Sequence, residues 1–115
     1  MLAACQMTPQ FWRTTRLKDY EKWINAAMQT TWLALARERI DSLKVGQAHV
    51  TCKILPDGRV SDFKLLSNSG GETLAIVARL TVERTFIPPI PAAALAELPH
   101  GYMPGNFTFI AYQGP

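Results

Sequence analysis

The sequence predicts an α+β domain: a small antiparallel sheet of three strands with two helices packed on one face. Three observations carry this prediction. A long stretch has the apolar spacing of a helix, two alternating segments flank a Pro-Asp-Gly turn, and a second amphipathic stretch precedes a β-rich terminal segment. The expected order is helix, strand, strand, helix, strand, which lets both helices cover the same face of the sheet.

Length and composition limit the class of protein. The chain has 115 residues, of which 48% are hydrophobic and 18% are charged. These values fit one globular domain with a modest core, which we place at residues 17–115 after an irregular segment, 1–16. The net charge is +3, but the basic residues are scattered, so we expect no nucleic-acid partner. The sequence has no run of 18 apolar residues, so we expect no membrane insertion by this chain.

The irregular segment carries Pro9 and two aromatic residues that we expect to be exposed, Phe11 and Trp12. It lacks the basic and apolar regions of a signal peptide. The letters LAAC, which end at Cys5, are similar to a bacterial lipoprotein cleavage box. Because no apolar run precedes them, we do not expect Cys5 to be lipidated.

The first helix is predicted from Leu17 to Ile40. Apolar side chains recur there at spacings of three and four, as on a helix with one buried face. The predicted buried stripe consists of Tyr20, Trp23, Ile24, Ala27, Met28, Thr31 and Leu35. We interpret this stripe as core and not as a ligand site.

Two strands and a turn follow. Alternating residues form one face of the first strand: Ala48, Val50, Cys52 and Ile54. In the turn Pro56-Asp57-Gly58, proline presets φ, aspartate hydrogen-bonds its own backbone and glycine accepts a positive φ. We therefore expect Gly58 at φ > 0.

The second strand is predicted from about Arg59 to Leu66. Its inward residues are expected to be Val60, Phe63 and Leu65. The step from Val60 to Phe63 breaks the alternation by one residue, so we predict a β-bulge between them.

Loop and cap residues at Ser67–Gly71 then start a second helix, predicted at Glu72–Thr85. Its inward residues are expected to be Leu74, Val77, Ala78, Thr81 and Val82. The three prolines of Ile87–Pro91 cannot continue a helix or sit in a central strand, and Ala92–Leu98 has the length of one short helical turn. β-propensity predicts a terminal strand at Phe107–Tyr112.

The polar residues do not indicate catalysis. Asp57 and Asp62 could be paired carboxylates, but the turn accounts for Asp57 and a solvated strand face accounts for Asp62. Ser67 and Ser69 have no histidine nearby in the sequence, and their place in a loop accounts for both. We therefore expect no catalytic residues.

Metal and cofactor sites are not indicated either. His49 and Cys52 are three residues apart on a predicted strand, which places them on opposite faces. The second cysteine, Cys5, is distant in sequence, and the only other histidine is His100. We expect no metal and no cofactor.

Several of these features occur together in one family. DYEKWINAAMQTTW, residues 19–32, is similar to TolA, whereas PDGRVSDFKLLSNSGG followed by FIPPIP is similar to TonB and its broad family. The intervening features, a glycine before an alternating strand and a helix with a buried apolar face, occur in the same order. The chain thus resembles, over most of its length, the C-terminal domain shared by the TonB and TolA cell-envelope proteins.

This resemblance implies a non-catalytic interaction domain in the periplasm, which serves energy transduction and transport across the cell envelope. The implied partner is an outer-membrane receptor or a periplasmic envelope protein, whose extended segment adds to an edge of the sheet. We expect the terminal strand to be that edge. The candidate partner-binding residues are Phe107, Thr108, Phe109, Ile110, Ala111 and Tyr112. Proline at Thr108 or Ile110 is then expected to abolish binding and to leave the fold intact.

An alternative function is a structural module that forms a homodimer through its edge strand. The resemblance also implies a disulfide between the strand cysteine and the second helix. Residues 72–86 contain no cysteine, so we expect Cys52 to be a buried free thiol. The inner-membrane helix and the extended spanner of full transducers are missing, so we expect either one domain of a longer protein or a shortened relative.

Overall fold

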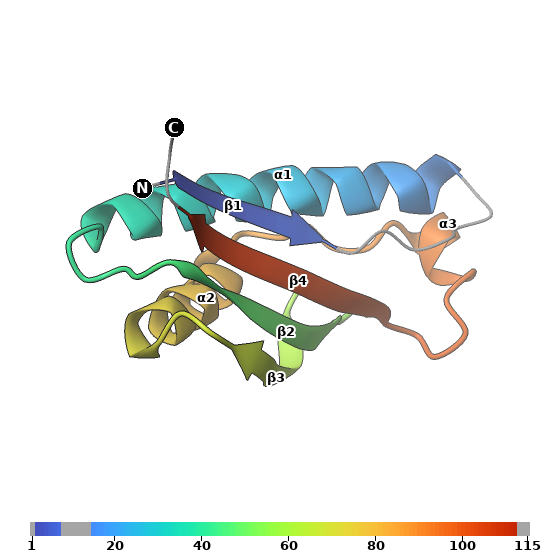
Figure 1. Ribbon diagram of the computed structural model, residues 1–115. Helices are drawn as coiled ribbons and strands as arrows, with labels where there is room; N and C mark the ends of the chain where they lie inside the picture. The colour runs from blue at the N-terminus through green and yellow to red at the C-terminus, as the bar shows by residue number, and fades with distance from the viewer. Residues whose placement is uncertain (1, 8–14, 113–115) are drawn as a thin grey trace.

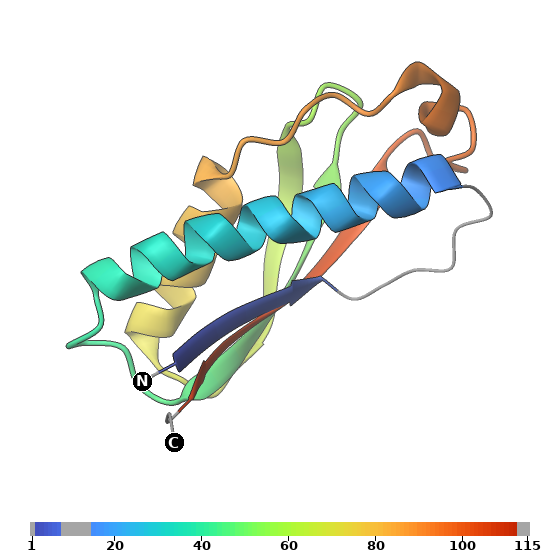
Figure 2. The ribbon, with the colours of Figure 1, turned by 90° about the horizontal axis from the view of Figure 1, so that it is seen from above.

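One antiparallel sheet organises the molecule. The computed structural model describes residues 2–7 and 15–112. The elements, in chain order, are β1 (Leu2–Met7), α1 (Thr15–Glu38), β2 (Gly46–Ile54), β3 (Val60–Asn68), α2 (Glu72–Arg84), α3 (Ala92–Leu95) and β4 (Met103–Tyr112). The strand order in the sheet is β1-β4-β2-β3. The long helix α1 and the shorter α2 lie on the same face of the sheet (Figure 1, Figure 2).

The α+β class is confirmed, but the prediction of three strands and two helices is wrong. The described residues form four strands and three helices. The additional strand, β1, lies in the segment that was predicted to be irregular. LAACQM has little β-propensity, so β1 forms through tertiary pairing with β4, from Leu2 opposite Tyr112 to Met7 opposite Phe107. Pro9, Phe11 and Trp12 lie outside the described residues.

The first helix spans Thr15–Glu38, two residues earlier at each end than predicted. Four of the predicted stripe residues are buried: Tyr20, Ile24, Met28 and Leu35. Trp23 was placed in the stripe wrongly, because it is 45% exposed, whereas Trp32 is fully buried. Trp32 follows Met28 by four residues and so lies on the same helix face, where its ring is 5.0 Å from that of Phe109.

The second helix confirms its prediction closely. All five predicted inward residues are buried: Leu74, Val77, Ala78, Thr81 and Val82. The buried hydroxyl of Thr81 donates a hydrogen bond of 2.7 Å to the carbonyl of Val77, so it carries no unpaired donor into the core. Gly71 precedes the helix at φ 88°.

The turn between β2 and β3 is formed as predicted. Gly58 has φ 90°, and its N–H donates to the carbonyl of Leu55 at 2.8 Å. The Asp57 carboxylate accepts the N–H of Arg59 at 3.0 Å, which fixes the turn from within.

β3 is irregular in two places. The predicted bulge is confirmed: the β2–β3 register shifts between Thr51 and Lys53, and Asp62 has φ 53°. A second shift, between His49 and Val50, was not predicted. Each bulge adds a residue to β3 and increases its local twist.

The cysteines are buried and unpaired. Cys52, which is 5% exposed, is a free thiol as predicted, and so is Cys5 at 4%. Desolvation by burial raises the pKa of each thiol to about 12. Within the described part of the chain, the helices are too short or too polar to cross a membrane.

Candidate interaction surface

The prediction that Phe107–Tyr112 forms the edge of the sheet is wrong. β4 lies between β1 and β2, so strands pair with both sides of its backbone. Its side chains do alternate as predicted. Three of them are buried under the helices: Phe107, Phe109 and Ala111. The other three, which are partly or largely exposed, face the opposite side: Thr108, Ile110 and Tyr112.

The direction of the hydrogen bonds follows from β2. The N–H of Leu55 donates to the carbonyl of Arg59, so the odd-numbered residues of β2 direct their polar groups toward β3 and the even-numbered ones toward β4. Across β4, the residues that pair with even-numbered β2 residues are odd-numbered. The backbone groups of Thr108 and Ile110 therefore face β1. Proline at either position would remove a bond inside the sheet, which corrects the expectation that the fold would survive it.

The outer side of β1 is covered by α1. The N–H of Met7 donates to the side-chain oxygen of Asn25 at 2.9 Å, and the N–H of Cys5 donates to that of Gln29 at 2.5 Å. Both β1 side chains are buried, Cys5 at 4% and Met7 at 6% exposure. At this edge of the sheet, side chains of α1 thus accept the hydrogen bonds that the outward N–H groups of β1 would otherwise offer to another strand.

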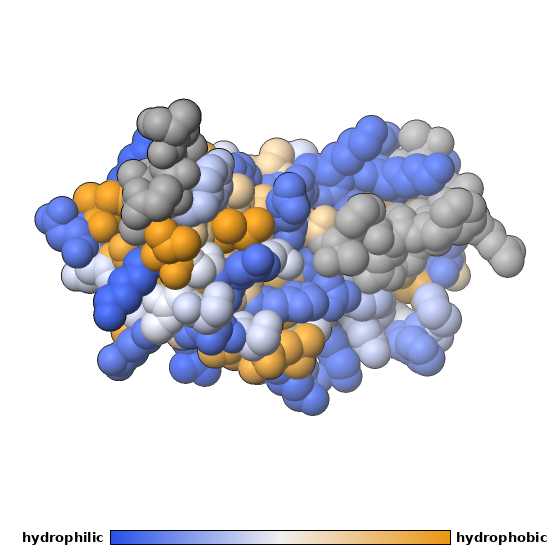
Figure 3. Space-filling model, viewed as in Figure 1, coloured by the Kyte–Doolittle hydropathy of each residue, from blue (hydrophilic) through white to orange (hydrophobic). Residues whose placement is uncertain are grey.

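β3 is the opposite edge, and no strand among the described residues pairs with its outer side, so we call it the open edge. Leu65 lies opposite the buried Val50 and faces the helix side of the sheet as predicted, but it is 43% exposed, and Leu66 is 57% exposed. Val60 and Phe63 do pack partly against the core. The second bulge lies at Leu66, between Leu65 and Ser67. On the helix-free face, hydrophobic side chains gather at the rim where β3 runs (Figure 3).

A shallow hollow separates β3 from α2, and we call it the β3–α2 groove. It has a volume of about 320 Å³ and is lined by Phe63, Leu65, Glu72, Ala75, Ile76 and Arg79. The Arg79 guanidinium lies 5.6 Å from the centre of the Phe63 ring and also pairs with Glu83 at 3.4 Å. The groove thus has an apolar floor and a charged rim.

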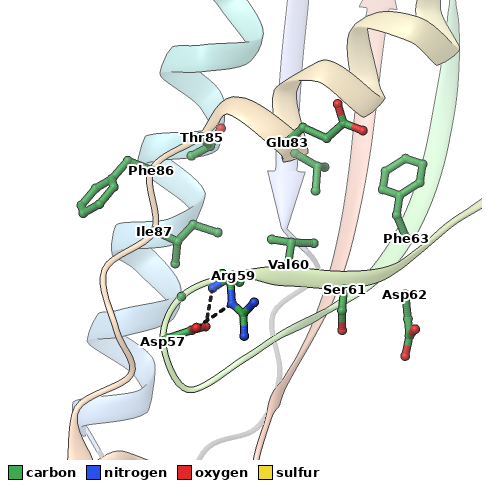
Figure 4. A pocket seen from close by; sticks show the side chains of 12 residues that line it. Asp57, Arg59, Val60, Ser61, Asp62, Phe63, Glu83, Thr85, Phe86 and Ile87 are labelled. Carbon is green, nitrogen blue, oxygen red and sulfur yellow. Dashed lines mark hydrogen bonds and ion pairs between the residues drawn. The ribbon is translucent and has the colours of Figure 1, made fainter.

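A second hollow, the hairpin pocket, lies beside the turn, between β3 and the end of α2 (Figure 4). Its volume is about 590 Å³, and Phe63 lines both hollows. Val60 points toward the end of α2, whereas Ser61 and Asp62 point away from it. Phe86 is 75% exposed at its rim. Apolar side chains therefore follow the open edge from the turn to the middle of α2.

The two carboxylates near the turn are engaged separately. Asp57 pairs with Arg59 at 2.6 Å, and the backbone hydrogen bond from Arg59 lowers the pKa of Asp57. Asp62 pairs with Lys53 at 3.0 Å, and this hydrogen bond raises the pKa of Lys53. Each carboxylate therefore serves a local ion pair, and the two do not form a shared acid–base site.

The sheet register brings together two polar residues that sequence spacing kept apart. His49 lies directly opposite Ser67, although 18 residues separate them in the chain. The Nε2 atom of His49 is buried without a hydrogen-bond partner among the described residues, so it accepts no hydrogen bond from the Ser67 hydroxyl. The same part of the chain holds no group of three His, Cys, Asp or Glu side chains suited to a metal.

Sequence comparison adds no assignment: no family model matches the chain, and no curated protein matches it significantly. The open edge of β3 is therefore the main guide to function. β3 is an outer strand with or without β1; sequence reasoning chose the other edge, β4, because it did not foresee that β1 pairs there. The available signal was the set of three large apolar residues crowded into one strand, namely Phe63, Leu65 and Leu66.

Proposed function

We propose that this chain is a non-catalytic interaction domain of the TonB/TolA type, which acts in the periplasm and binds an extended segment of an envelope protein along β3. The observation that carries the proposal is the open edge of β3 beside an apolar groove. With β1 and the short α3 left aside, the order α1-β2-β3-α2-β4 supports it, since this is the order that the family resemblance implies.

The backbone of β3 supplies the attachment points. Val60 and Leu65 lie opposite Ile54 and Val50, which are even-numbered residues of β2 and direct their polar groups toward β4. The N–H and C=O groups of Val60 and Leu65 therefore face outward, where an added strand forms its ladder.

The groove supplies the selectivity. Alternate side chains of an added strand point to the same face, so those on the helix side enter the β3–α2 groove. The apolar groove floor favours a partner with small or medium apolar residues at every second position. The two bulges of β3 keep the ladder short, which suits reversible binding.

Amide-shift mapping by NMR tests the proposal. The probes are ten-residue peptides from the periplasm-facing segments of outer-membrane receptors, and the shifts are expected along Val60–Asn68 and at Ile76. Leu65→Pro should abolish binding because it removes an outward donor, whereas Leu65→Ala should weaken it only modestly. The matched control is the same peptide with alternate amides N-methylated, which keeps the side chains and loses the donors.

Three outcomes count against this proposal. Shifts confined to β1 and β4 would place binding at the other edge. Equal binding by the N-methylated peptides would show that binding does not depend on a ladder of backbone hydrogen bonds. A molecular mass that rises with concentration, with shifts along β3 and no response to any peptide, would favour the alternative of a homodimer formed through this edge.

A further inference from the structure

The helix-free face of the sheet carries a polar hollow near the β2–β3 turn, and we call it the Thr51 hollow. It has a volume of about 320 Å³ and is lined by residues of β2, β3 and β4 and by Tyr102, which precedes β4. Val50 and Cys52 are buried under the helices, so Thr51 between them points to the opposite face. The hollow is thus separated from the β3–α2 groove by the sheet itself.

Thr51 forms the floor of the hollow, because its side chain is shorter than those around it. Lys64 on β3 and Asn106 on β4 lie directly opposite Thr51 on its two sides, and Lys53 follows two residues later on the same face of β2. Opposite side chains in a sheet are about 5 Å apart, and those two residues apart on a strand are separated by about 6.6 Å. Two ammonium groups, an amide and a hydroxyl therefore surround one small space.

One of the two lysines is held in a fixed orientation. The Nζ atom of Lys53 lies 3.0 Å from the carboxylate of Asp62 and 4.8 Å from the centre of the Tyr102 ring. The Tyr102 ring stacks in turn against His100, with 5.9 Å between the ring centres. A cation that is already held by two partners loses little conformational freedom when a ligand binds beside it.

The bulge of β3 places the Asp62 carboxylate on this face. Val60 and Phe63 both pack against the core, whereas Ser61 and Asp62 between them both point away from α2 (Figure 4). Two successive residues can share a face only at a bulge. Asp62 has φ 53°, and in the described part of the chain it is the only residue other than glycine with a positive φ. Backbone conformations of this kind cost free energy and cluster at ligand sites.

The second lysine has no partner of its own. Lys64 is exposed, and no hydrogen bond or ion pair joins it to another described residue. The charged residues that line the hollow are Lys53, Lys64 and Asp62. Since Asp62 balances Lys53, the charge of Lys64 stays without a counter-ion, and the hollow favours an anion.

The donors indicate which kind of anion fits. A planar carboxylate is best matched by the fork of an arginine, whereas lysine binds phosphate as a point charge. The described lining of the hollow contains lysine and no arginine. A phosphate monoester carries about −1.5 to −2 charges at pH 7 and three strong acceptor oxygens. The Lys64 ammonium, the Thr51 hydroxyl and the Asn106 amide are three donors for those oxygens.

We propose that the Thr51 hollow is a binding site for a phosphate monoester. Lys64, Thr51 and Asn106 donate to the phosphate oxygens, and Lys53, oriented by Asp62 and Tyr102, supplies the second positive charge. The site is independent of the strand binding proposed at β3, because it uses side chains of the helix-free face. A volume of about 320 Å³ is at the lower end for small-molecule sites and suits one phosphate with a small group attached.

Amide-shift mapping by NMR on the whole chain tests the proposal. Titration with glucose 6-phosphate should give saturable shifts at the amides of Thr51, Lys53, Lys64 and Asn106, and inorganic phosphate should shift the same amides. Glucose and acetate, at the same concentration and ionic strength, should leave them unchanged. No saturable shift with glucose 6-phosphate, or equal shifts with acetate, would overturn the proposal.

Substitutions separate a site from general attraction by charge. Lys64→Ala should weaken the binding of glucose 6-phosphate about tenfold, because a hydrogen bond to a charged group is lost. Thr51→Val keeps the shape and the β-propensity of the residue and should weaken binding roughly fivefold through the hydroxyl alone. Lys22→Ala removes the same charge from an exposed position of α1 and is the matched control. Equal losses for Lys22→Ala and Lys64→Ala would contradict a defined site.

Vesicles distinguish the two sources of such a ligand, a lipid headgroup and a free ester. The probes are phosphatidylcholine vesicles with and without phosphatidic acid, whose headgroup is a phosphate monoester. Sedimentation with phosphatidic acid that glucose 6-phosphate displaces, and that Lys64→Ala loses, would assign the site to a lipid surface. Saturable binding of glucose 6-phosphate without such sedimentation would assign it to a free ester. Failure of both probes to bind would overturn the proposal.

Discussion

β1 and β3 are the two outer strands of one sheet, and they treat their unpaired backbone groups in opposite ways. On β1, the outward N–H groups of Cys5 and Met7 donate hydrogen bonds to side-chain amide oxygens of α1. On β3, the outward groups meet no other strand of the described sheet, and Leu65 and Leu66 are exposed beside them. An open edge invites pairing with other chains, so each strand needs its own protection.

The difference shows two kinds of protection. A helix covers β1, which allows that strand to be short and poor in β-formers. Bulges distort β3, which discourages long, flat pairing between copies but leaves short stretches of backbone open to a partner. The covered edge is thus suited to one defined strand, and the distorted edge to a transient one.

Proline substitutions give the most direct test of this comparison. Thr108→Pro should lower the free energy of unfolding by roughly 3 kcal/mol, because it removes a donor to β1 inside the sheet. Leu65→Pro, whose N–H faces outward, should cost less than about 1 kcal/mol. Urea unfolding measures both. Equal losses in the free energy of unfolding would mean that the N–H groups of Thr108 and Leu65 do not differ in their pairing.

Two glycines at the ends of β3 separate backbone strain from steric conflict. Gly58 and Gly71 have φ of 90° and 88°. A Cβ atom on Gly58 would lie 2.1 Å from the carbonyl oxygen of Ile87, whereas one on Gly71 would have nothing within 4 Å. We expect Gly58→Ala to cost about 2 kcal/mol or more and Gly71→Ala about 1 kcal/mol. Similar midpoints in urea would remove the role of the contact with Ile87.

The stability at alkaline pH compares Cys5, on the covered edge, with Cys52, in the interior of the sheet. Burial raises the pKa of Cys5 and Cys52 from 9.0 to about 12, so the unfolded chain releases these protons first. The stabilisation is fully present below pH 9 and is lost as the pH rises toward 12. Each thiol adds up to about 1.4 kcal/mol per pH unit to the slope in that window.

The alanine variants of the two cysteines test this prediction. Cys52→Ala should reduce the alkaline slope of the free energy of unfolding by one proton. Cys5→Ala should reduce it by less, because a released β1 lets Cys5 ionise before the domain unfolds. Unfolding in urea at several values between pH 8 and 11 gives both slopes. A larger change for Cys5→Ala than for Cys52→Ala would show that β1 does not separate from β4 before the domain unfolds.

The smallest expected effect concerns the rim of the groove. Arg79→Ala removes an exposed ion pair with Glu83 and the contact with the Phe63 ring. We expect it to change the free energy of unfolding by less than about 0.5 kcal/mol, while the affinity for an added strand falls. Lys22→Ala on α1 is the control. A large loss of stability would show that Arg79 supports the fold instead of the surface.

Features with a local cause were predictable from the sequence. The turn at Gly58, the bulge at Asp62 and the buried face of α2 each depend on residues within one turn or one helix. The stripe of α1 was predicted only in part: Trp32, four residues after Met28, lies on the buried face against Phe109, whereas Trp23 is exposed.

The edges of the sheet were not predictable in this way. β1 has few β-formers, and two amides of a helix hold it in place, 18 and 24 residues away in sequence. Without β1, the terminal strand was the natural candidate for the edge. The candidate site therefore moved from Phe107–Tyr112 to β3 once the tertiary pairing was known.

The register of β1 against β4 also determines how the sheet carries load. Leu2 and Tyr112 are opposite each other at one end of the pair, and both ends of the described chain lie there (Figure 2). A pull between these two residues strains the pairs one at a time, as in opening a zipper. A strand held along β3 and pulled along its axis instead strains all its bonds together, in shear. The pairing proposed along β3 would therefore resist a pull better than the pairing of β1 with β4.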